Sequence, residues 1–227
     1  TTLRLWRDLV RSRPWTHVVD VGANYGEMLV DLEGAAGATI LAVEPNPHVR
    51  RHLERTLREA GVPATIVPKA VSDAEGRLPL TIDRTWSGMS AVHGDPAETA
   101  GHRLETIEVE ATTLRALLHD GAPDAAKRVL LKVDVEGHEP AVLRGLPLSG
   151  AGYAELAALV EIRHLGPTDL SLLLRAFDVD LFDPQAGTFA RFGAGGLDAL
   201  LAALEGGRFH REDAVLRPRP AIGAPRA

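Results

Sequence analysis

The feature that most constrains the fold is an apolar run that ends in an acid and two glycines. Residues 18–27 read VVDVGANYGE, so Asp20 stands near the end of the run and a turn extends from Gly22 to Gly26. This pattern is typical of a buried parallel strand that enters a tight turn and then a helix beneath a bound ligand. It predicts an open α/β sheet with a ligand site at the carboxyl end of this strand.

A second strand end supplies an acid for the same site. The run 40–43 ends in Glu44, at about the distance from the turn where dinucleotide-binding folds place the acid that holds a ribose. The turn reads G-x-x-x-G and lacks the middle glycine that brings backbone amides close to a pyrophosphate. The spacing therefore favours S-adenosylmethionine, which has no diphosphate, and leaves an NAD-dependent oxidoreductase as the alternative.

Composition and charge describe an ordinary globular chain with one core. The 227 residues are 45% hydrophobic and 25% charged, and the net charge is −6. We therefore expect a small-molecule substrate, with neither nucleic acid nor a membrane as a partner. The lack of cysteine excludes disulfides, cysteine metal sites and thiol nucleophiles. No apolar run approaches the roughly 18 to 20 residues that span a bilayer and no signal-like segment is evident, so we expect a cytoplasmic protein.

Hydrophobic periodicity predicts strands and helices in alternation. We expect a leading helix within residues 1–14, one domain over 15–217, and a disordered tail or linker over 218–227. The chain begins at Thr1 rather than at methionine, as a trimmed chain or a part of a longer protein would. The expected strands are 17–21, 39–43, 64–67, 129–133, 156–162, 179–182, 188–192 and 214–216, and the expected helices are 25–33, 47–60, 112–119, 168–177 and 197–205.

The second informative stretch is residues 129–139, which read VLLKVDVEGHE. It is another apolar strand that ends in carboxylates and a glycine. Because ligands of open α/β sheets lie outside the carboxyl ends of the strands, Asp134 should lie beside the pocket opened by Asp20 and Glu44. Strand alternation puts Lys132 on the same side as Asp134, where we expect a salt bridge.

Five segments occur in the order seen in one known family. They resemble the FkbM-type S-adenosylmethionine-dependent methyltransferases from about residue 16 to about residue 217, and the first and last of them are together specific. The segments are 20–26 (DVGANYG), 43–47 (VEPNP), 70–73 (AVSD), 87–90 (SGMS) and 131–139 (LKVDVEGHE).

The resemblance implies a Rossmann-like class I methyltransferase fold, with a mostly parallel seven-stranded sheet and helices on both faces. It also implies S-adenosylmethionine as the cofactor and O-methylation, commonly of a hydroxyl on a natural product or sugar. By this resemblance Glu44 is the acid that holds the ribose, and Ser72 and Asp73 lie near the adenine. The cofactor turn is formed by Asp20, Gly22, Asn24 and Gly26.

One position departs from the family pattern. The family usually has an aspartate after a Thr-Leu pair, whereas this chain has Arg115 after Thr113 and Leu114. A base in place of an acid changes a substrate contact or a structural one, so the substrate class is not carried over from the resemblance. The cofactor assignment does not depend on this position.

Methyl transfer is an in-line displacement at a sulfonium, so the enzyme must hold the acceptor oxygen about 3 Å from the methyl carbon. A hydroxyl acceptor also loses a proton, and a positioned base is worth about 10² to 10⁴ in rate. His138 is the first candidate base, because the first turn of a helix disfavours the imidazolium; packing under the loop is its alternative role. Asp134 and Glu136 are competing bases, and for Asp134 we favour orienting the ammonium group of the cofactor.

The acceptor side is expected to involve a polar loop and one further strand end. Ser87, Met89 and Ser90 lie in the loop and are expected to bind the acceptor beneath a lid. Glu161 and His164 follow the strand 156–162 and are expected on the same side. We assign no metal ligand, although Asp134 and Glu161 could share Mg²⁺ with substrate hydroxyls through oxygen ligands; hydrogen bonding is the alternative.

Other functions remain open at this stage. An N-methyltransferase differs only in the acceptor. An oxidoreductase is disfavoured because neither Tyr25 nor Tyr153 has a lysine four residues further on. A catalytically silent nucleoside-binding module is the third alternative, to which Arg115 gives slight support. The oligomeric state and the acceptor are not determined by the sequence.

Overall fold

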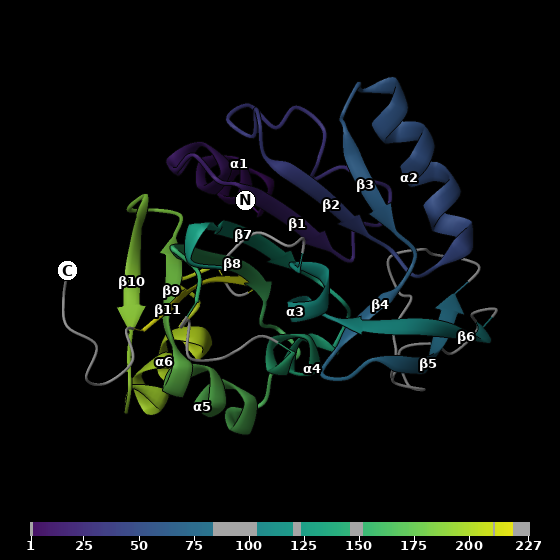
Figure 1. Cartoon of the computed structure of the whole chain (residues 1–227). Helices are drawn as coiled ribbons and strands as arrows, with labels where there is room; N and C mark the ends of the chain where they lie inside the picture. Colours follow the sequence, from purple (N-terminus) through teal and green to yellow (C-terminus); the bar gives the residue numbers. More distant parts are fainter. Residues whose placement is uncertain (1, 84–103, 120–123, 146–151, 211, 220–227) are drawn as a thin grey trace.

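A computed structural model describes residues 2–83, 104–119, 124–145, 152–210 and 212–219 (Figure 1). The described chain is rich in strands, and helices connect most of the parallel ones. Among the described residues, no helix is long and apolar enough to cross a membrane.

The main sheet is built around β1 (His17–Val21), which pairs in parallel with β2 (Thr39–Val43) and β7 (Arg128–Val133). The predicted mostly parallel α/β sheet is thereby confirmed. In the part of the chain that the structure describes, the sheet has eight strands rather than the expected seven, in the order β10-β9-β11-β8-β7-β1-β2-β3. The other strands are β3 (Ala64–Val67), β8 (Glu155–Glu161), β9 (Phe177–Asp183), β10 (Thr188–Phe192) and β11 (Asp213–Pro218).

The strands beyond β8 form an antiparallel edge of the main sheet. β11 runs antiparallel to both β8 and β9, and β10 pairs antiparallel with β9 through a hairpin. The sequence predicted each of these strands, but it did not predict that both strands of the hairpin join the main sheet. The parallel strands and their carboxyl ends are unaffected by this addition.

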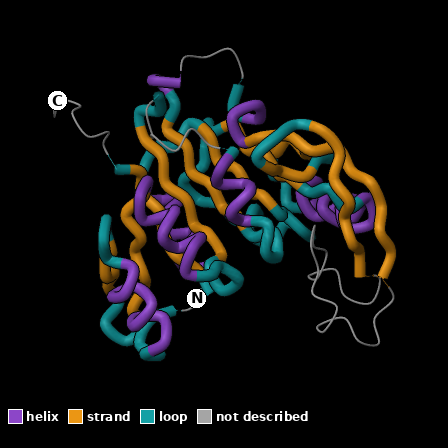
Figure 2. Tube along the Cα trace, turned by 90° about the horizontal axis from the view of Figure 1, so that it is seen from below, coloured by secondary structure: helices purple, strands orange, loops and turns teal. Residues whose placement is uncertain are grey.

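Helices cover both faces of the main sheet, as expected (Figures 1 and 2). Alternate residues of the central strands belong to two separate hydrophobic clusters: Val18 packs with one set of helices and Val19 with the other. On one face lie α1 (Thr2–Ser12) and α2 (Pro47–Glu59), and on the other lie α3 (Leu114–Leu117), α4 (Glu139–Arg144), α5 (Pro167–Ala176) and α6 (Leu197–Glu205); a short 3-10 helix spans Asp124–Ala126.

A second, three-stranded sheet projects from one side of the main sheet (Figures 1 and 2). It consists of β4 (Ala70–Ser72), β5 (Gly76–Asp83) and β6 (Leu104–Thr113), in the order β4-β6-β5. The hairpin of β5 and β6 has its own small apolar cluster, which includes Leu80 and Ile82. The sequence also indicates extended segments over 78–82 and 106–110, on either side of the polar loop, and β5 and β6 confirm them.

The prediction of a helix over residues 25–33 is wrong. Turns replace it, and Gly26 and Asp31 have φ values of 87° and 57°, which a right-handed helix does not accommodate. The apolar residues Met28 and Leu29 of this segment pack in a hydrophobic cluster with Trp6. The backbone carbonyl of Met28 also accepts a hydrogen bond of 2.7 Å from the indole of Trp6. The helix expected over 112–119 is also shorter, since β6 continues to Thr113.

Trp6 therefore holds the segment after the first turn in place, and we expect Trp6→Ala to be strongly destabilising. The side chain is fully buried, and its removal should lower the free energy of unfolding by about 3 to 5 kcal/mol. Leu3→Ala, on the exposed side of the same helix, should change it by less than about 0.5 kcal/mol. Urea unfolding measures both values, and similar losses for the two variants would contradict the role of Trp6.

Candidate cofactor and acceptor site

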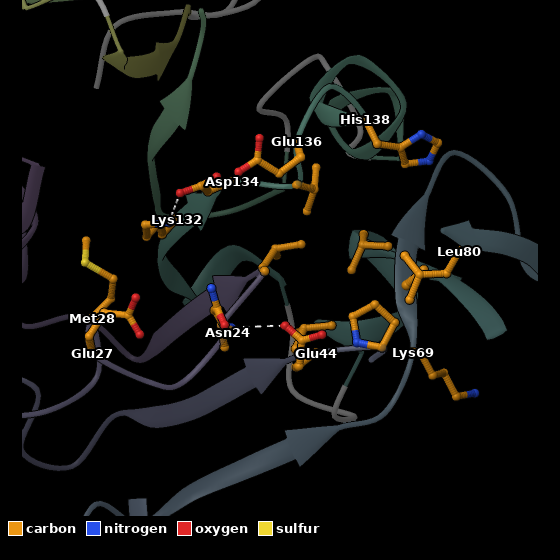
Figure 3. A pocket seen from close by; sticks show the side chains of 18 of the residues that line it. Asn24, Glu27, Met28, Glu44, Lys69, Leu80, Lys132, Asp134, Glu136 and His138 are labelled. Atoms are coloured by element: carbon orange, nitrogen blue, oxygen red, sulfur yellow. Dashed lines mark hydrogen bonds and ion pairs between the residues drawn. The ribbon is translucent and has the colours of Figure 1, made fainter. Parts of the chain in front are cut away.

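A cavity of about 310 Å³ lies at the carboxyl ends of β1, β2 and β7 (Figure 3). Four of the sequence-predicted cofactor residues line it, whereas the other four do not. The lining residues are Gly22, Asn24, Glu44 and Asp134, and those that do not line it are Asp20, Gly26, Ser72 and Asp73.

The two glycines of the turn have steric reasons to be glycine. Gly22 has φ = 84°, and a Cβ on it would lie 1.9 Å from the carbonyl oxygen of Asp134. Gly26 has φ = 87°, and its Cβ would lie 2.8 Å from a methyl group of Leu53. The turn after β1 is therefore pressed against the loop after β7 on one side and against α2 on the other.

Glu44 joins the turn after β1 to the end of β2. Its Oε2 accepts from the backbone N–H of Asn24 at 3.0 Å, and its Oε1 accepts from the backbone N–H of Asn46 at 2.8 Å. Burial raises the pKa of Glu44 to about 7, against the opposing effect of these two hydrogen bonds. Each carboxylate oxygen keeps a second acceptor position, so the group can still bind a hydroxyl in the cavity.

Asn24 presents an acceptor without a partner. Its backbone is left-handed, with φ = 46°. Its Oδ1 is buried and has no hydrogen-bond partner among the described residues, although the residue lines the cavity. A buried polar atom that lacks a partner is costly, so this atom fits a ligand that donates a hydrogen bond.

Asp20 lies behind the cavity rather than in its wall. It is fully buried, and within the described part of the chain neither of its carboxylate oxygens has a hydrogen-bond partner. Burial raises the pKa of Asp20 to about 6; the ammonium of Lys132 lowers it and the charge of Asp134 raises it. Asp20 is therefore a buried acid that acts on the site by its charge.

The expected salt bridge between Lys132 and Asp134 is confirmed. The ammonium lies 2.8 Å from Oδ2 of Asp134, and both residues line the cavity. Burial alone would lower the pKa of Lys132, but the charges of Asp20 and Asp134 outweigh it and raise the pKa. The lysine is therefore charged at neutral pH.

Glu139 fixes the loop after β7, and the sequence analysis did not assign it a role. The side chain is fully buried and accepts backbone hydrogen bonds from Val135 at 2.9 Å and from Gly137 at 3.0 Å. The loop is left-handed at Glu136 and Gly137, with φ of 50° and 94°. An acid in the first turn of a helix that binds back to preceding amides is a recognisable capping signal, and it would have identified this residue.

His138 immediately precedes α4 rather than lying within its first turn. Its Nε2 lies 3.0 Å from the hydroxyl of Ser72, and its ring points toward the β4 and β5 side of the cavity (Figure 3). Asp73 accepts from Ser72 at 3.3 Å and from Arg144 at 3.2 Å. His138 thus contacts the predicted adenine side, and its assignment as the base stays a prediction.

Glu136, Glu161 and His164 form a cluster at the end of β8. Their ligand atoms lie within 4.8 Å of one another. The guanidinium of Arg163 lies among them, 3.0 Å from Glu136 and 3.0 Å from Glu161, and supplies the positive charge that the carboxylates need. Asp134, for which an ion shared with Glu161 was only the alternative, is paired with Lys132.

Burial, followed by the charges of Asp134 and Glu136, raises the pKa of Glu161 to about 8. Of this cluster, Glu136 lines the cavity, whereas Glu161 and His164 do not. The other expected acceptor residues, Ser87, Met89 and Ser90, lie outside the described residues.

The buried charge of Asp20 gives a pH dependence with a definite sign. The ordinary pKa is 3.8 and the folded value is about 6, so between these values the unfolded chain loses a proton that the folded chain keeps. Stability without cofactor therefore falls as the pH rises through this window. Asp20→Asn removes the effect, and above pH 6 it should raise the free energy of unfolding by up to about 3 kcal/mol.

Urea unfolding at several pH values measures this difference. The exposed Asp198→Asn variant is the control and should stay within about 0.5 kcal/mol of the wild type at every pH. A difference between Asp20→Asn and wild type that does not change between pH 4 and 6 would show that Asp20 is not a buried acid of raised pKa.

Comparison with known proteins places this site in a family. The model described as "Methyltransferase FkbM domain" matches residues 20–167. Methyltransferase sdnD from Sordaria araneosa is 34% identical over 154 residues, which are 57% of this chain and 60% of that protein. The match thus spans less than two thirds of the curated relative.

The similarity to solved structures concerns the fold. A putative O-methyltransferase from Klebsiella pneumoniae is 14% identical, with a TM-score of 0.50 over 96% of this chain and 80% of that chain. A precorrin-6y C5,15-methyltransferase from Geobacter metallireducens is 11% identical, with a TM-score of 0.46 over 96% and 87% of the two chains. The predicted class I methyltransferase fold is confirmed, and the match over residues 20–167 shows that this chain belongs to the FkbM methyltransferase family.

Proposed function

We propose that the protein is an S-adenosylmethionine-dependent methyltransferase that methylates a hydroxyl of a small natural product or sugar. The observation that carries the proposal is the cavity at the ends of β1, β2 and β7, with Asn24 and Glu44 in its wall. Support for the reaction class comes from the FkbM family match and from the relative described as a methyltransferase. Support for an oxygen acceptor comes from the solved chain described as a putative O-methyltransferase.

The residues of the cavity fit the proposed cofactor. Glu44 keeps free acceptor positions for two ribose hydroxyls, and a carboxylate is the strongest acceptor for them. Gly22 lines the cavity, and glycine there allows the backbone of Asp134 to approach the turn. The partnerless oxygen of Asn24 offers a further contact to a donor of the ligand.

The far wall of the cavity suits an adenine ring. It is apolar, with side chains of Pro45, Ala70, Val71 and Leu80. Flat aromatic ligands gain affinity by burying both faces against such side chains. Ser72 and Asp73 lie behind this wall, so we assign them a supporting rather than a direct role.

The cofactor, when bound, supplies an electrophilic methyl group on a sulfonium. The work of the chain is then to exclude water, to hold the acceptor oxygen in line with that group, and to accept its proton. Val135 and Leu80 contribute apolar surface to the cavity wall. Glu136, Asp134 and His138 all line the cavity and remain the candidates for the base.

Binding and turnover test the proposal directly. Thermal unfolding should shift upward with S-adenosylhomocysteine but not with NADH, because ligand at 100 times its dissociation constant adds about 2.7 kcal/mol. A panel of hydroxyl and amine acceptors with labelled S-adenosylmethionine then distinguishes O- from N-methylation. A shift with NADH alone would contradict the proposal, and tight binding without any turnover would support a silent binding module.

Glu44→Ala should weaken the binding of S-adenosylhomocysteine. Loss of a charge-assisted hydrogen bond costs about 1.5 to 3 kcal/mol, which is about a 10- to 150-fold rise in the dissociation constant. Titration calorimetry measures this constant. Glu54→Ala, on the exposed side of α2, is the matched control, and equal affinities for the two variants would remove Glu44 from the site.

His138→Ala distinguishes a base from a supporting residue. Because His138 is the first candidate base, we expect His138→Ala to lower kcat about 100-fold or more and to abolish the pH dependence of kcat, with the cofactor dissociation constant little changed. If the variant instead raises the dissociation constant several-fold while the pH profile of kcat persists, His138 is a supporting residue that acts through its contact with Ser72, and Ser72→Ala should then have the same effect to a smaller extent.

A further inference from the structure

The two ends of the cavity differ in chemistry. Lys132, Asp134, Glu27 and Met28 lie together at one end, whereas Leu80, Lys69 and His138 lie at the other (Figure 3). The second end also holds the apolar wall of Pro45, Ala70, Val71 and Leu80, which suits the nucleoside. The charged end requires a different group, because the buried ammonium of Lys132 needs polar partners beyond the half-exposed Asp134.

Lys132 is a buried residue of a central strand, next to Asp20. It belongs to β7, opposite Asp20 of β1 in the strand register, and its side chain is about 95% buried. Within the described residues its ammonium makes one hydrogen bond, to Asp134. An ammonium has three donors, so two remain for a ligand in the cavity that this residue lines.

The pair carries one charge of each sign within 2.8 Å. An α-amino acid carries a carboxylate and an ammonium at a similar separation, so its carboxylate can face the lysine while its ammonium faces the aspartate. We propose that Lys132 binds the α-carboxylate of the methionine part of the cofactor, while Asp134 binds its ammonium. The inference rests on the proposed function and adds a binding role for Lys132.

The surrounding charges favour a ligand that carries both signs. Asp20 and Asp213 act on Lys132 in addition to Asp134, and Glu27 lines the same end of the cavity. This excess of acid repels a ligand that carries only a carboxylate. It also keeps the ammonium of Lys132 protonated, so that it can still donate to the carboxylate of a zwitterion.

Two probes separate this contact from the rest of the site. S-Adenosylhomocysteine has the amino acid, and 5′-methylthioadenosine keeps the nucleoside and the sulfur but lacks the amino acid. In Lys132→Met the dissociation constant for S-adenosylhomocysteine should rise at least about tenfold, the lower end expected for a lost hydrogen bond between charged groups. The constant for 5′-methylthioadenosine should change less than about twofold, which also shows that the variant is folded.

Two further variants complete the test. Lys132→Arg keeps the charge and should restore part of the preference for S-adenosylhomocysteine. Lys69→Met removes the lysine at the other end of the same cavity, where it pairs with Glu110 at 3.2 Å, and should leave the ratio of the two dissociation constants unchanged.

The outcomes separate this inference from the proposed function. Equal loss of both ligands in Lys132→Met, or no loss of either, overturns the role of Lys132 and leaves the cofactor assignment intact. Failure of the wild type to bind either ligand overturns both. Selective loss of S-adenosylhomocysteine supports the inference.

Discussion

The site depends on the contact between the turn after β1 and the loop after β7. Only glycine at position 22 allows the backbone of Asp134 to come so close, since a Cβ would lie 1.9 Å from its carbonyl oxygen. Parallel pairing of the two strands then brings Lys132 beside Asp20. The charged end of the cavity follows from this one approach of two chain segments.

Part of the molecule was predictable because its signals are local. The strand ends at Asp20, Glu44 and Asp134 follow from apolar runs that stop at acids, and their convergence follows from parallel pairing. The helix expected after the first turn was wrong because the backbone is left-handed at Gly26 and Asp31, and because the indole of Trp6, from the preceding helix, binds the backbone carbonyl of Met28. A pattern of apolar residues does not reveal which partner covers them.

The finer arrangement of the site needed the structure. Long-range contacts such as that between His138 and Ser72, or the insertion of Arg163 between Glu136 and Glu161, depend on side-chain directions that sequence spacing does not specify. The place of the β9 and β10 hairpin at the edge of the main sheet also needed the structure. Its two strands were expected, but their place in the main sheet depends on tertiary pairing.

The β5 and β6 hairpin has an evolutionary consequence. It lies outside the main sheet and has an apolar cluster of its own, yet Leu80 reaches the cavity wall. Mutations or length changes in this hairpin leave the register of the eight main strands untouched. The shape of the apolar wall can therefore diverge there among descendants of one ancestor, or be exchanged by grafting, while the charged end formed after β1 and β7 is inherited unchanged.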